Sequence, residues 1–279
     1  DRAGRVIRPA LLWNDQRTAE QCRAITRAAG GRAALIRMVN NPALTGYTAP
    51  KILWFREHEP RRFDRLAKVV LPKDYIRLKL SGEIATDVAD ASGTLLLDVR
   101  RRSWHAGLLA RLGLDRSLLP ELVESPEPTG RLRAEAAAEL GLSPGAIVVG
   151  GAGDQPAGGV GYGIVAEGLV SATLGTSGVL FAHSRRMAPN GGGTLQSFCH
   201  AVPGAWCVFG CMLSAGGSLA WLRDTLWPEQ VSAIRGAGGD PGRLYPAIIE
   251  EAERVSPGGD GLLFLPYLTG ERCPYADPR

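Results

Sequence analysis

One glycine-rich stretch constrains this sequence more than any other. Residues 150–163 read GGAGDQPAGGVGYG and follow the apolar run Ala146–Val149, which is typical of a short buried strand. Glycines let the backbone turn sharply and let a ligand approach the main chain closely. Pro156 suits the first turn of a helix, where its missing N–H costs no hydrogen bond. The stretch therefore predicts a strand-to-helix crossing, which is a common place for ligands in α/β sheets.

A single acid, Asp154, stands in this stretch and is followed by Gln155. An acid that a glycine-rich turn presents is a candidate for contact with a substrate. The alternative is that Asp154 serves only as the N-cap of the helix, because Asp is a favoured cap residue. The local pattern leaves both interpretations open.

The composition narrows the class of protein. A length of 279 residues allows one large domain or two smaller ones. The net charge is +4 and the basic residues are scattered, so a nucleic-acid partner is not predicted. No apolar run is long enough to span a bilayer, and a membrane partner is not predicted either. The five cysteines lack the spacing of a secreted disulfide framework, which favours reduced thiols in the cytoplasm.

The first part of the chain predicts a helix behind a polar loop. Thr18 and Gln21 have the spacing of a capping box, so we expect a helix over 19–29 that ends at Gly30-Gly31. The loop before it carries Trp13, Asp15 and Arg17, and such loops carry function more often than cores do. The alternative is a core tryptophan beside a local Asp–Arg pair of little energetic weight.

The next segments predict further short elements. Pro50 can begin an apolar helix that Pro60 stops. Val69–Leu71 indicates a strand, and 75–80 a helix. Residues 87–93 indicate a polar loop, followed by a strand over 94–99. Its acids, Asp87 and Asp90, are three residues apart and could hold a metal, although a turn with side-chain-to-backbone hydrogen bonds is the favoured interpretation.

After Gly163 the pattern changes from alternating helices and strands to hairpins. The runs 169–174 and 179–183 are rich in strand formers and are separated by Gly175, Thr176, Ser177 and Gly178. Backbone N–H groups and hydroxyls in such a turn suit phosphate oxygens. Gly216 and Gly217 lead into a helix over 219–226, and a glycine-rich entry to a helix can also face an anion.

Several other chemistries are excluded or weakened. The sequence has no GxxxxGK[ST] motif, and Gly151-Ala-Gly153 lacks the third glycine of the dinucleotide fingerprint. Cys199, His200, Cys207 and Cys211 match the spacing of no common zinc site, so no metal-ligating residues are predicted. Ser214 misses the position of a nucleophile elbow by one residue, which disfavours a serine hydrolase.

The chain resembles the FGGY family of carbohydrate kinases over essentially its whole length. Residues 46–58 fit the first signature of that family at each defined position. The further runs that carry the resemblance are WNDQRT at 13–18, GGAGDQPAGGVG at 150–161, LGTSGVLF at 174–181, FCHAVPGAW at 198–206, MLSAGGSLAWLRD at 212–224 and FLPYLTGERCPYADP at 264–278. Several long runs in the family's order are far more specific than one glycine loop.

The resemblance implies an α/β protein with the two-domain, actin/RNase H-like fold of sugar kinases. Residues 1–165 would belong to the N-terminal, sugar-binding domain, which carries the catalytic acid. Residues 166–279 would form the first part of the C-terminal domain, on the nucleotide side. The family's phosphate hairpin would precede Asp1 and its adenosine motif would follow Arg279, so both domains are expected to be incomplete in this chain.

The resemblance also implies an activity and a set of site residues. The activity is ATP-dependent phosphorylation of a ketose with Mg²⁺, in particular of D-xylulose on O5 in xylose metabolism, by a cytoplasmic transferase. Asp154 would be the catalytic base. The residues that would bind the sugar are Trp13, Asp15, Asp154 and Gln155, and those that would bind the nucleotide are Gly175, Thr176, Ser177, Gly216 and Gly217.

Two alternatives remain open at this point. The chain could act on ribulose, glycerol or gluconate, because substrate choice depends on the shape of the pocket. It could also be a truncated sugar-binding protein without catalysis. The expected partners are a small sugar and ATP, with a homodimer as a candidate assembly.

Overall fold

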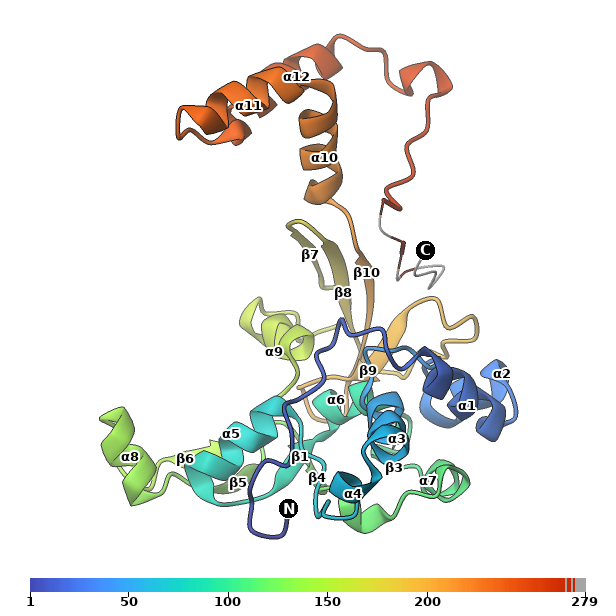
Figure 1. Cartoon of the computed structure of the whole chain (residues 1–279), viewed down its shortest axis with the longest axis vertical. Helices are drawn as coiled ribbons and strands as arrows, with labels where there is room; N and C mark the ends of the chain where they lie inside the picture. Colours follow the sequence, from blue (N-terminus) through green and yellow to red (C-terminus); the bar gives the residue numbers. More distant parts are fainter. Residues whose placement is uncertain (269, 272, 274–279) are drawn as a thin grey trace. The chain divides into compact units, whose positions relative to one another are not determined.

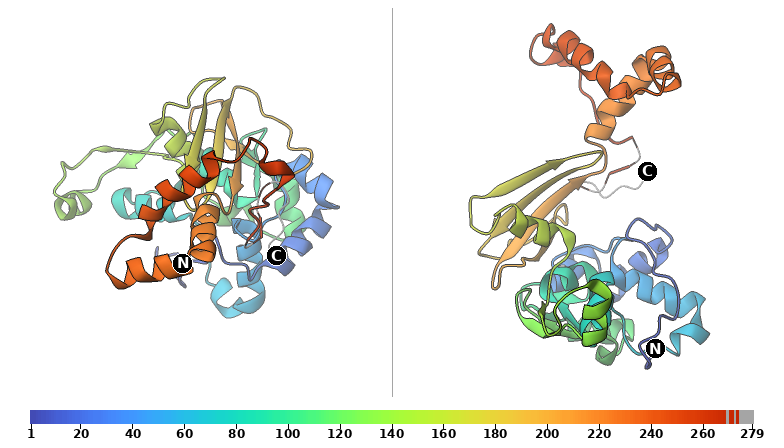
Figure 2. Two further views of the ribbon diagram at one scale, coloured as in Figure 1. Left: turned by 90° about the horizontal axis from the view of Figure 1, so that it is seen from above. Right: turned by 90° about the vertical axis from the view of Figure 1, so that its left-hand side faces the viewer.

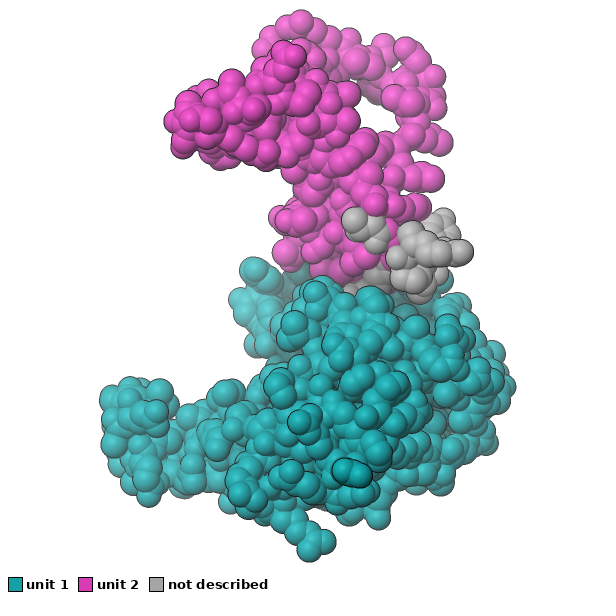
Figure 3. Space-filling view, viewed as in Figure 1, with its two compact units in different colours: residues 1–171, 181–209 teal, residues 172–180, 210–279 magenta. Residues whose placement is uncertain are grey.

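The computed structural model describes residues 1–268, 270, 271 and 273. Its contacts divide the chain into two compact units, which are residues 1–171 with 181–209 (unit 1) and residues 172–180 with 210–279 (unit 2), coloured separately in Figure 3. Part of the run at 264–278 that carries the family resemblance lies outside the described residues. The domain boundary expected after residue 165 stays a prediction.

Unit 1 consists of helices around several short strands (Figure 1). Its helices are α1 (Ala19–Ala29), α2 (Arg32–Val39), α3 (Thr48–His58), α4 (Pro60–Phe63), α5 (Pro72–Ser81), α6 (Val88–Ala91), α7 (Ala106–Leu112), α8 (Ala134–Leu140) and α9 (Asp154–Gly161), with the 3-10 turns η1 (Ser92–Thr94) and η2 (Arg116–Leu118). Unit 2 contains α10 (Gly216–Leu226), α11 (Pro228–Gly236) and α12 (Tyr245–Glu253), with η3 (Pro241–Leu244) and η4 (Gly259–Gly261).

The strands form small sheets and one larger one. β1 (Ala85–Asp87) pairs in parallel with β4 (Glu121–Val123), while β2 (Leu97–Asp98) with β3 (Ser103–Trp104) and β5 (Pro128–Arg131) with β6 (Ile147–Val149) are antiparallel pairs. The remaining strands are β7 (Val170–Leu174), β8 (Gly178–Ser184), β9 (Gln196–Cys199) and β10 (Trp206–Met212). They form one sheet in the order β7-β8-β10-β9; Figure 1 labels the strands, and the right-hand view of Figure 2 shows strands of this sheet side by side. Mixed helices and sheets confirm the predicted α/β class.

The core of unit 1 gathers side chains from α1, α2, α7, the segment around β2, and β8. Its fully buried members include Ile25, Leu35, Leu95, Leu108 and Phe181. Burying each of these side chains contributes about 1.5–3 kcal/mol, so this core holds the N-terminal helices and the start of the larger sheet in one unit.

The predicted helix over 19–29 is confirmed, although its predicted capping box is wrong. Gly30 adopts φ +91°, and the N–H groups of Gly30 and Gly31 donate to the carbonyls of Arg27 and Thr26, which ends α1 in the manner of a Schellman motif. At the other end Thr18 makes no side-chain cap. Its hydroxyl donates to the Thr45 carbonyl instead, so a tertiary contact replaces the local one.

Three of the short elements differ from the sequence prediction. Val69–Leu71 is not a strand, and Val69 makes a single backbone hydrogen bond to the Leu118 carbonyl at 2.8 Å instead of a ladder. The segment predicted as a loop is helical from Val88 onward, because Asp87 at the end of β1 caps α6 by accepting from the Asp90 N–H at 2.9 Å. The strand predicted over 94–99 shortens to β2, because Leu95 takes φ +65° and turns the chain.

Candidate active site

The predicted strand-to-helix crossing is present. β6 leads through the loop 150–153 into α9, whose first residue is Asp154. Gly153 is the N-cap, so the alternative in which Asp154 serves only as the cap is wrong. β6 is not the buried strand that its composition indicates, since Ile147 is 59% and Val149 43% exposed. It lies in a two-stranded ribbon with β5, and two strands cannot bury both faces of an apolar strand.

Asp154 presents its carboxylate to solvent at the N-terminal end of α9. The residue is exposed, and Gln155 Nε2 donates to Asp154 Oδ2 at 3.3 Å. A negative charge in the first turn complements the positive end of the helix dipole. The carboxylate therefore lies at the start of α9 and is accessible to a ligand.

The loop before Asp154 fits tightly against the β4–β5 connection. The N–H groups of Gly150 and Gly151 donate to the carbonyls of Glu127 and Ser125, both at 2.9 Å. A Cβ at Gly150 would stand 2.7 Å from the Glu124 carbonyl oxygen, which no real side chain tolerates, and Gly151 adopts φ +71°. These two glycines are required by backbone geometry, whatever approaches the loop from outside.

A group of charged side chains lies behind this loop, and the sequence analysis singled out only two of its members, Asp87 and Asp90. It consists of Lys73, Asp74 and Arg77 on α5, Asp87 at the end of β1 and Asp90 on α6. Asp74, Arg77 and Asp87 are buried, at 1%, 4% and 0% exposure. The further signal in the sequence is the pattern K-D-x-x-R at 73–77, of which Lys73 and Asp74 precede the helix predicted over 75–80.

Burial and neighbouring charges shift the pKa values in this group. Burial raises the pKa of Asp90 to about 6, against the opposing attraction of Lys73, and the charges of Asp87 and Asp74 raise it further. Burial also raises the pKa of Asp87, again opposed by Lys73. The pKa of Lys73 is raised although burial alone would lower it, because the three carboxylates around it favour the ammonium form.

The N-terminal loop with Trp13 is a second polar group in unit 1. Trp13 is 62% exposed, so the alternative of a core tryptophan is wrong, whereas the local pair of Asp15 with Arg17 is confirmed at 2.9 Å. Hydrogen bonds from Arg17 lower the pKa of Asp15. The loop is fixed against the start of α3, because a Cβ at Gly46 would lie 2.8 Å from the Trp13 carbonyl oxygen and Lys51 Nζ donates to the Gly46 carbonyl at 2.9 Å.

The residues expected at the nucleotide come together in unit 2. Gly175, Thr176 and Ser177 form the turn between β7 and β8. The N–H of Gly216 donates to the Gly175 carbonyl at 2.9 Å, and that of Gly217 donates to the Thr176 carbonyl at 3.0 Å. The start of α10 therefore packs directly on the turn, with glycines at the contact. The Gly175 N–H donates to the Ser177 carbonyl at 2.9 Å, so the N–H groups of Gly175, Gly216 and Gly217 all have acceptors within the protein.

The predicted site residues thus fall into three groups, namely the Trp13–Asp15 loop and the Asp154–Gln155 pair in unit 1, and the glycine turn with α10 in unit 2. Asp15 bonds to Arg17 and Gln155 bonds to Asp154, so each pair is held by its own neighbours in the sequence. In residues 1–268, 270, 271 and 273, no three His, Cys, Asp or Glu side chains form a group that could hold a metal ion.

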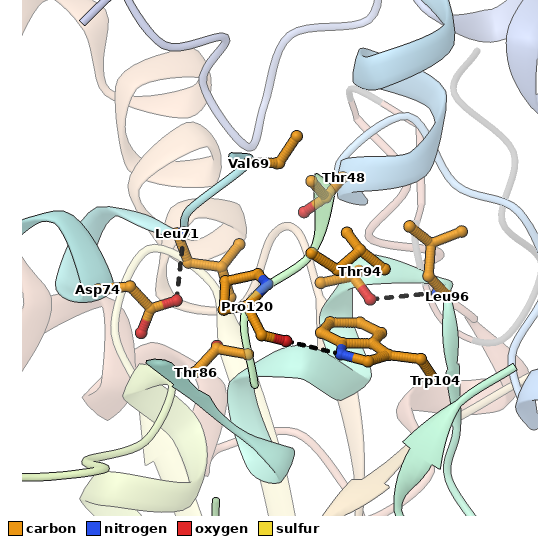
Figure 4. Close-up of a pocket in the computed structure, with 10 residues that line it drawn as sticks. Thr48, Val69, Leu71, Asp74, Thr86, Thr94, Leu96, Trp104 and Pro120 are labelled. Carbon is orange, nitrogen blue, oxygen red and sulfur yellow. Dashed lines mark hydrogen bonds between the residues drawn. The ribbon is translucent and has the colours of Figure 1, made fainter. Parts of the chain in front are cut away.

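A small cavity lies in unit 1 beside the charged group, and Asp74 belongs to both (Figure 4). Its volume is about 10 Å³, and its walls include Thr48, Asp74, Thr86 and Trp104, whose indole N–H donates to the Pro120 carbonyl at 2.9 Å. Ligand pockets of enzymes are about 300–1,000 Å³. This cavity is therefore part of the packing of unit 1 and is not a place for a sugar.

Comparison with known proteins identifies relatives along the whole chain. Residues 1–161 match the N-terminal domain of the FGGY family of carbohydrate kinases, and residues 170–279 match its C-terminal domain. A xylulose kinase of Lactococcus lactis is 40% identical over 98% of this chain and 51% of its own length, and one of Klebsiella pneumoniae is 40% identical over 100% and 54%.

A crystal structure of xylulose kinase from Rhodospirillum rubrum superimposes with a TM-score of 0.88 at 30% identity, over 99% of this chain and 54% of that one. The chain thus spans about half the length of the relatives that it matches. The described helix segments are, in addition, all too short or too polar to cross a membrane.

Proposed function

The chain belongs to the FGGY family of carbohydrate kinases, whose fold is actin/RNase H-like, and we propose that it phosphorylates D-xylulose with ATP. The observation that carries the proposal is the identity of 40% with xylulose kinases across 98% to 100% of the chain. The exposed carboxylate at the start of α9 supports it, because the reaction needs a proton acceptor beside the sugar hydroxyl.

We assign the role of proton acceptor to Asp154. A sugar hydroxyl is a poor nucleophile until its proton has an acceptor, and a carboxylate within hydrogen-bond reach supplies one. Gln155, which donates to Asp154, would orient that carboxylate toward the sugar. Trp13 would offer an exposed aromatic face to the sugar, beside Asp15. Phosphoryl transfer otherwise depends on positioning and on charge stabilisation.

The turn of Gly175, Thr176 and Ser177 is our candidate for contact with the phosphates of ATP. Because the N–H groups of Gly175, Gly216 and Gly217 bond within the fold, we expect the phosphate contacts to come from the N–H groups of Thr176 and Ser177 and from their hydroxyls. Mg²⁺, bound with ATP, would neutralise phosphate charge, and it prefers phosphate oxygens, water and one or two carboxylates over a cage of protein ligands.

The proposed partners are therefore small molecules, a ketose and a nucleotide. We propose a cytoplasmic location, because the buried Cys199 and Cys207 are thiols without a disulfide and reduced thiols are typical of that compartment.

Replacing Asp154 with Asn tests the catalytic role. In the enzyme expressed from its complete reading frame, Asp154→Asn should lower kcat by at least about 100-fold, because general-base catalysis contributes about 10²–10⁴. Binding of D-xylulose, followed by calorimetry, should persist. Ser177→Ala is the comparison and should cost much less, because backbone groups share the phosphate contact. Near-normal turnover of the Asn variant would remove Asp154 from the role.

A panel of acceptors tests the substrate. ADP release should be fastest, in kcat/KM, with D-xylulose, and slower with ribulose, glycerol and gluconate. A preference for one of the other three would keep the kinase activity and overturn the proposed substrate. No ADP release with any of them would overturn the proposed function itself.

A further inference from the structure

Both ends of the loop before Asp154 rest on the same set of charges. We call this set the charged clamp, and its members are Lys73, Asp74, Arg77, Asp87 and Asp90. At the first end, the Arg77 guanidinium donates to the Gly150 carbonyl and, at 3.4 Å, to that of Val149. At the second end, Asp90 Oδ1 lies 3.0 Å from the position that a Cβ at Gly153 would take. Gly153 directly precedes Asp154.

Ion pairs inside the charged clamp connect these two ends. Asp74 Oδ1 accepts from Arg77 at 3.0 Å and from Lys73 at 2.6 Å. The Lys73 ammonium reaches Asp87 at 2.5 Å and Asp90 at 3.6 Å. A path of contacts therefore runs from the Gly150 carbonyl through Arg77, Asp74 and Lys73 to Asp90, which lies beside Gly153, the N-cap of α9. Lys73 is its centre, since it meets three carboxylates from α5, β1 and α6.

A further hydrogen-bonded link runs through the β4–β5 connection. Ser125 Oγ donates to Asp87 Oδ1 at 3.4 Å, and the Ser125 carbonyl accepts from the Gly151 N–H at 2.9 Å. The loop is thus fixed by hydrogen bonds at Gly150 and Gly151, whose partners lead to the buried carboxylates, while Gly153 lies beside the Asp90 carboxylate. Removing one charge from such a network leaves its partners buried and unpaired, which costs more than the pair itself is worth.

We propose that Lys73 is a positioning residue, which sets the Asp154 carboxylate for phosphoryl transfer by holding Asp90 against Gly153 and Asp74 against Arg77. The proposal rests on the proposed function of Asp154. In this proposal, Lys73 contacts neither a substrate nor the reacting atoms. Its loss should act on the rate of the chemical step, because a misplacement of about 1 Å at a catalytic group can cost about 10²-fold in rate.

The first test replaces Lys73 in the enzyme expressed from its complete reading frame. Lys73→Met should lower kcat about 10- to 100-fold, because the Asp154 carboxylate would be misplaced in the transition state. KM for D-xylulose should change less than about 3-fold, because the contacts that bind the sugar in the ground state remain. Lys79→Met, on an exposed turn of the same helix, is the matched control and should keep the parental kcat. Equal kcat values for the two variants would overturn the proposal.

The second test uses the contact at Gly153 and leaves the buried ammonium in place. Gly153→Ala should lower kcat, because its Cβ would press on the Asp90 carboxylate, whereas Gly158→Ala on the same helix meets nothing within 4 Å and should not. Adding Asp90→Ser shortens the opposing side chain. The double variant should then lose much less than the product of the two single losses. A loss of kcat in the double variant equal to the product of the losses in the two single variants would contradict the proposal.

The pH dependence supplies a readout that a purely structural role would not change. Asp90 faces Lys73 and Asp74 from α5 and Asp87 from β1, and the pKa of about 6 places its proton uptake in an accessible range. The ratio of kcat between the parent and Asp90→Asn should fall toward one as the pH drops through about 6. A ratio that stays constant with pH would count against the charged clamp.

Hydrogen–deuterium exchange separates a failure of this proposal from a failure of the proposed function. In Lys73→Met, the amides of 150–161 should exchange faster than in Lys79→Met, whatever reaction the protein catalyses. Faster exchange in a protein that phosphorylates no sugar would retain the clamp and remove the kinase role. Unchanged exchange of these amides in Lys73→Met, in an enzyme that does phosphorylate D-xylulose, would overturn the clamp and leave the kinase role in place.

Discussion

His183 and His200 form a buried pair in unit 1. Their ring centroids lie 5.1 Å apart, and His200 is 0% exposed. His200 Nδ1 accepts from the Val202 N–H at 2.9 Å, which assigns the other ring nitrogen as the protonated one. Burial, together with the charge of His183, lowers the pKa of His200 to about 4. Both rings are therefore neutral in the folded protein at neutral pH.

This pair predicts a loss of stability in weak acid. The pKa of His200 falls from its ordinary 6.5 to about 4 on folding, so its contribution is complete above pH 6.5 and is lost as the pH falls toward 4. The loss is on the order of 2 kcal/mol in the free energy of unfolding. Urea midpoints measured between pH 4.5 and 7.5 should show it.

His200→Asn keeps an acceptor for the Val202 N–H and removes the titration, so its stability should vary less over this pH range. His58→Asn, at an exposed position, should follow the parent. If both variants show the same pH dependence as the parent, His200 is not the group responsible.

At the scale of elements, α9 packs on β8 through a glycine. A Cβ at Gly159 would lie 2.5 Å from the Phe181 ring, which is itself 2% exposed and part of the core. Gly158, one residue earlier, faces open space. The glycines of α9 thus have different roles, and only Gly159 sets how closely the helix carrying Asp154 approaches the sheet.

Gly159→Ala should therefore lower the free energy of unfolding by about 1–3 kcal/mol, as overpacking of a core does. Gly158→Ala should raise it by up to about 1 kcal/mol, because alanine favours the helix and loses less backbone entropy on folding. Chemical denaturation of both variants measures the difference. Equal effects would show that the contact with Phe181 does not limit the packing of α9.

The sequence predicted elements whose signals are local. Gly30 ends α1 because only a left-handed residue closes that turn, and Pro156 marks the first turn of α9, so both helices were placed correctly. The side chains that cap a helix were not predictable in the same way. Gln21 donates to Glu57 on α3 instead of forming a capping box with Thr18. Which partner such a side chain takes is decided by tertiary packing.

The same division applies to the candidate site. Asp154 could be singled out because one acid stands in a glycine-rich turn. Lys73 could not, because its partners come from three elements and meet only after β1 and α6 have packed on α5. Without that geometry, a lysine followed by an aspartate at the start of a helix indicates only a solvated helix end.

At the scale of the whole molecule, the chain matches both FGGY domains, and in residues 1–268, 270, 271 and 273 no three His, Cys, Asp or Glu side chains form a group that could hold a metal ion. In the proposed reaction we expect a divalent ion to bind mainly through ATP, since Mg²⁺ favours phosphate oxygens and water. The nucleotide and the ion should behave as one ligand.

Metal removal tests that expectation. Excess EDTA should abolish ADP formation, and added Mg²⁺ should restore it. Mg²⁺ alone should leave the melting temperature unchanged, whereas ATP with Mg²⁺ should raise it, because a ligand at 100 times its Kd stabilises by about 2.7 kcal/mol. A rise in melting temperature with Mg²⁺ alone would reveal a protein-held ion and contradict the expectation.

The parallel pairing of β1 with β4 joins segments that are far apart along the chain, Ala85 opposite Glu121, and the glycine loop at 150 is hydrogen-bonded to the connection that follows β4. Anyone who transplants the stretch GGAGDQP into another scaffold would therefore have to carry 72–91 and 121–127 with it. The heptapeptide taken alone would lose the geometry of its acid, because the parts that hold it were assembled from three regions of the primary structure.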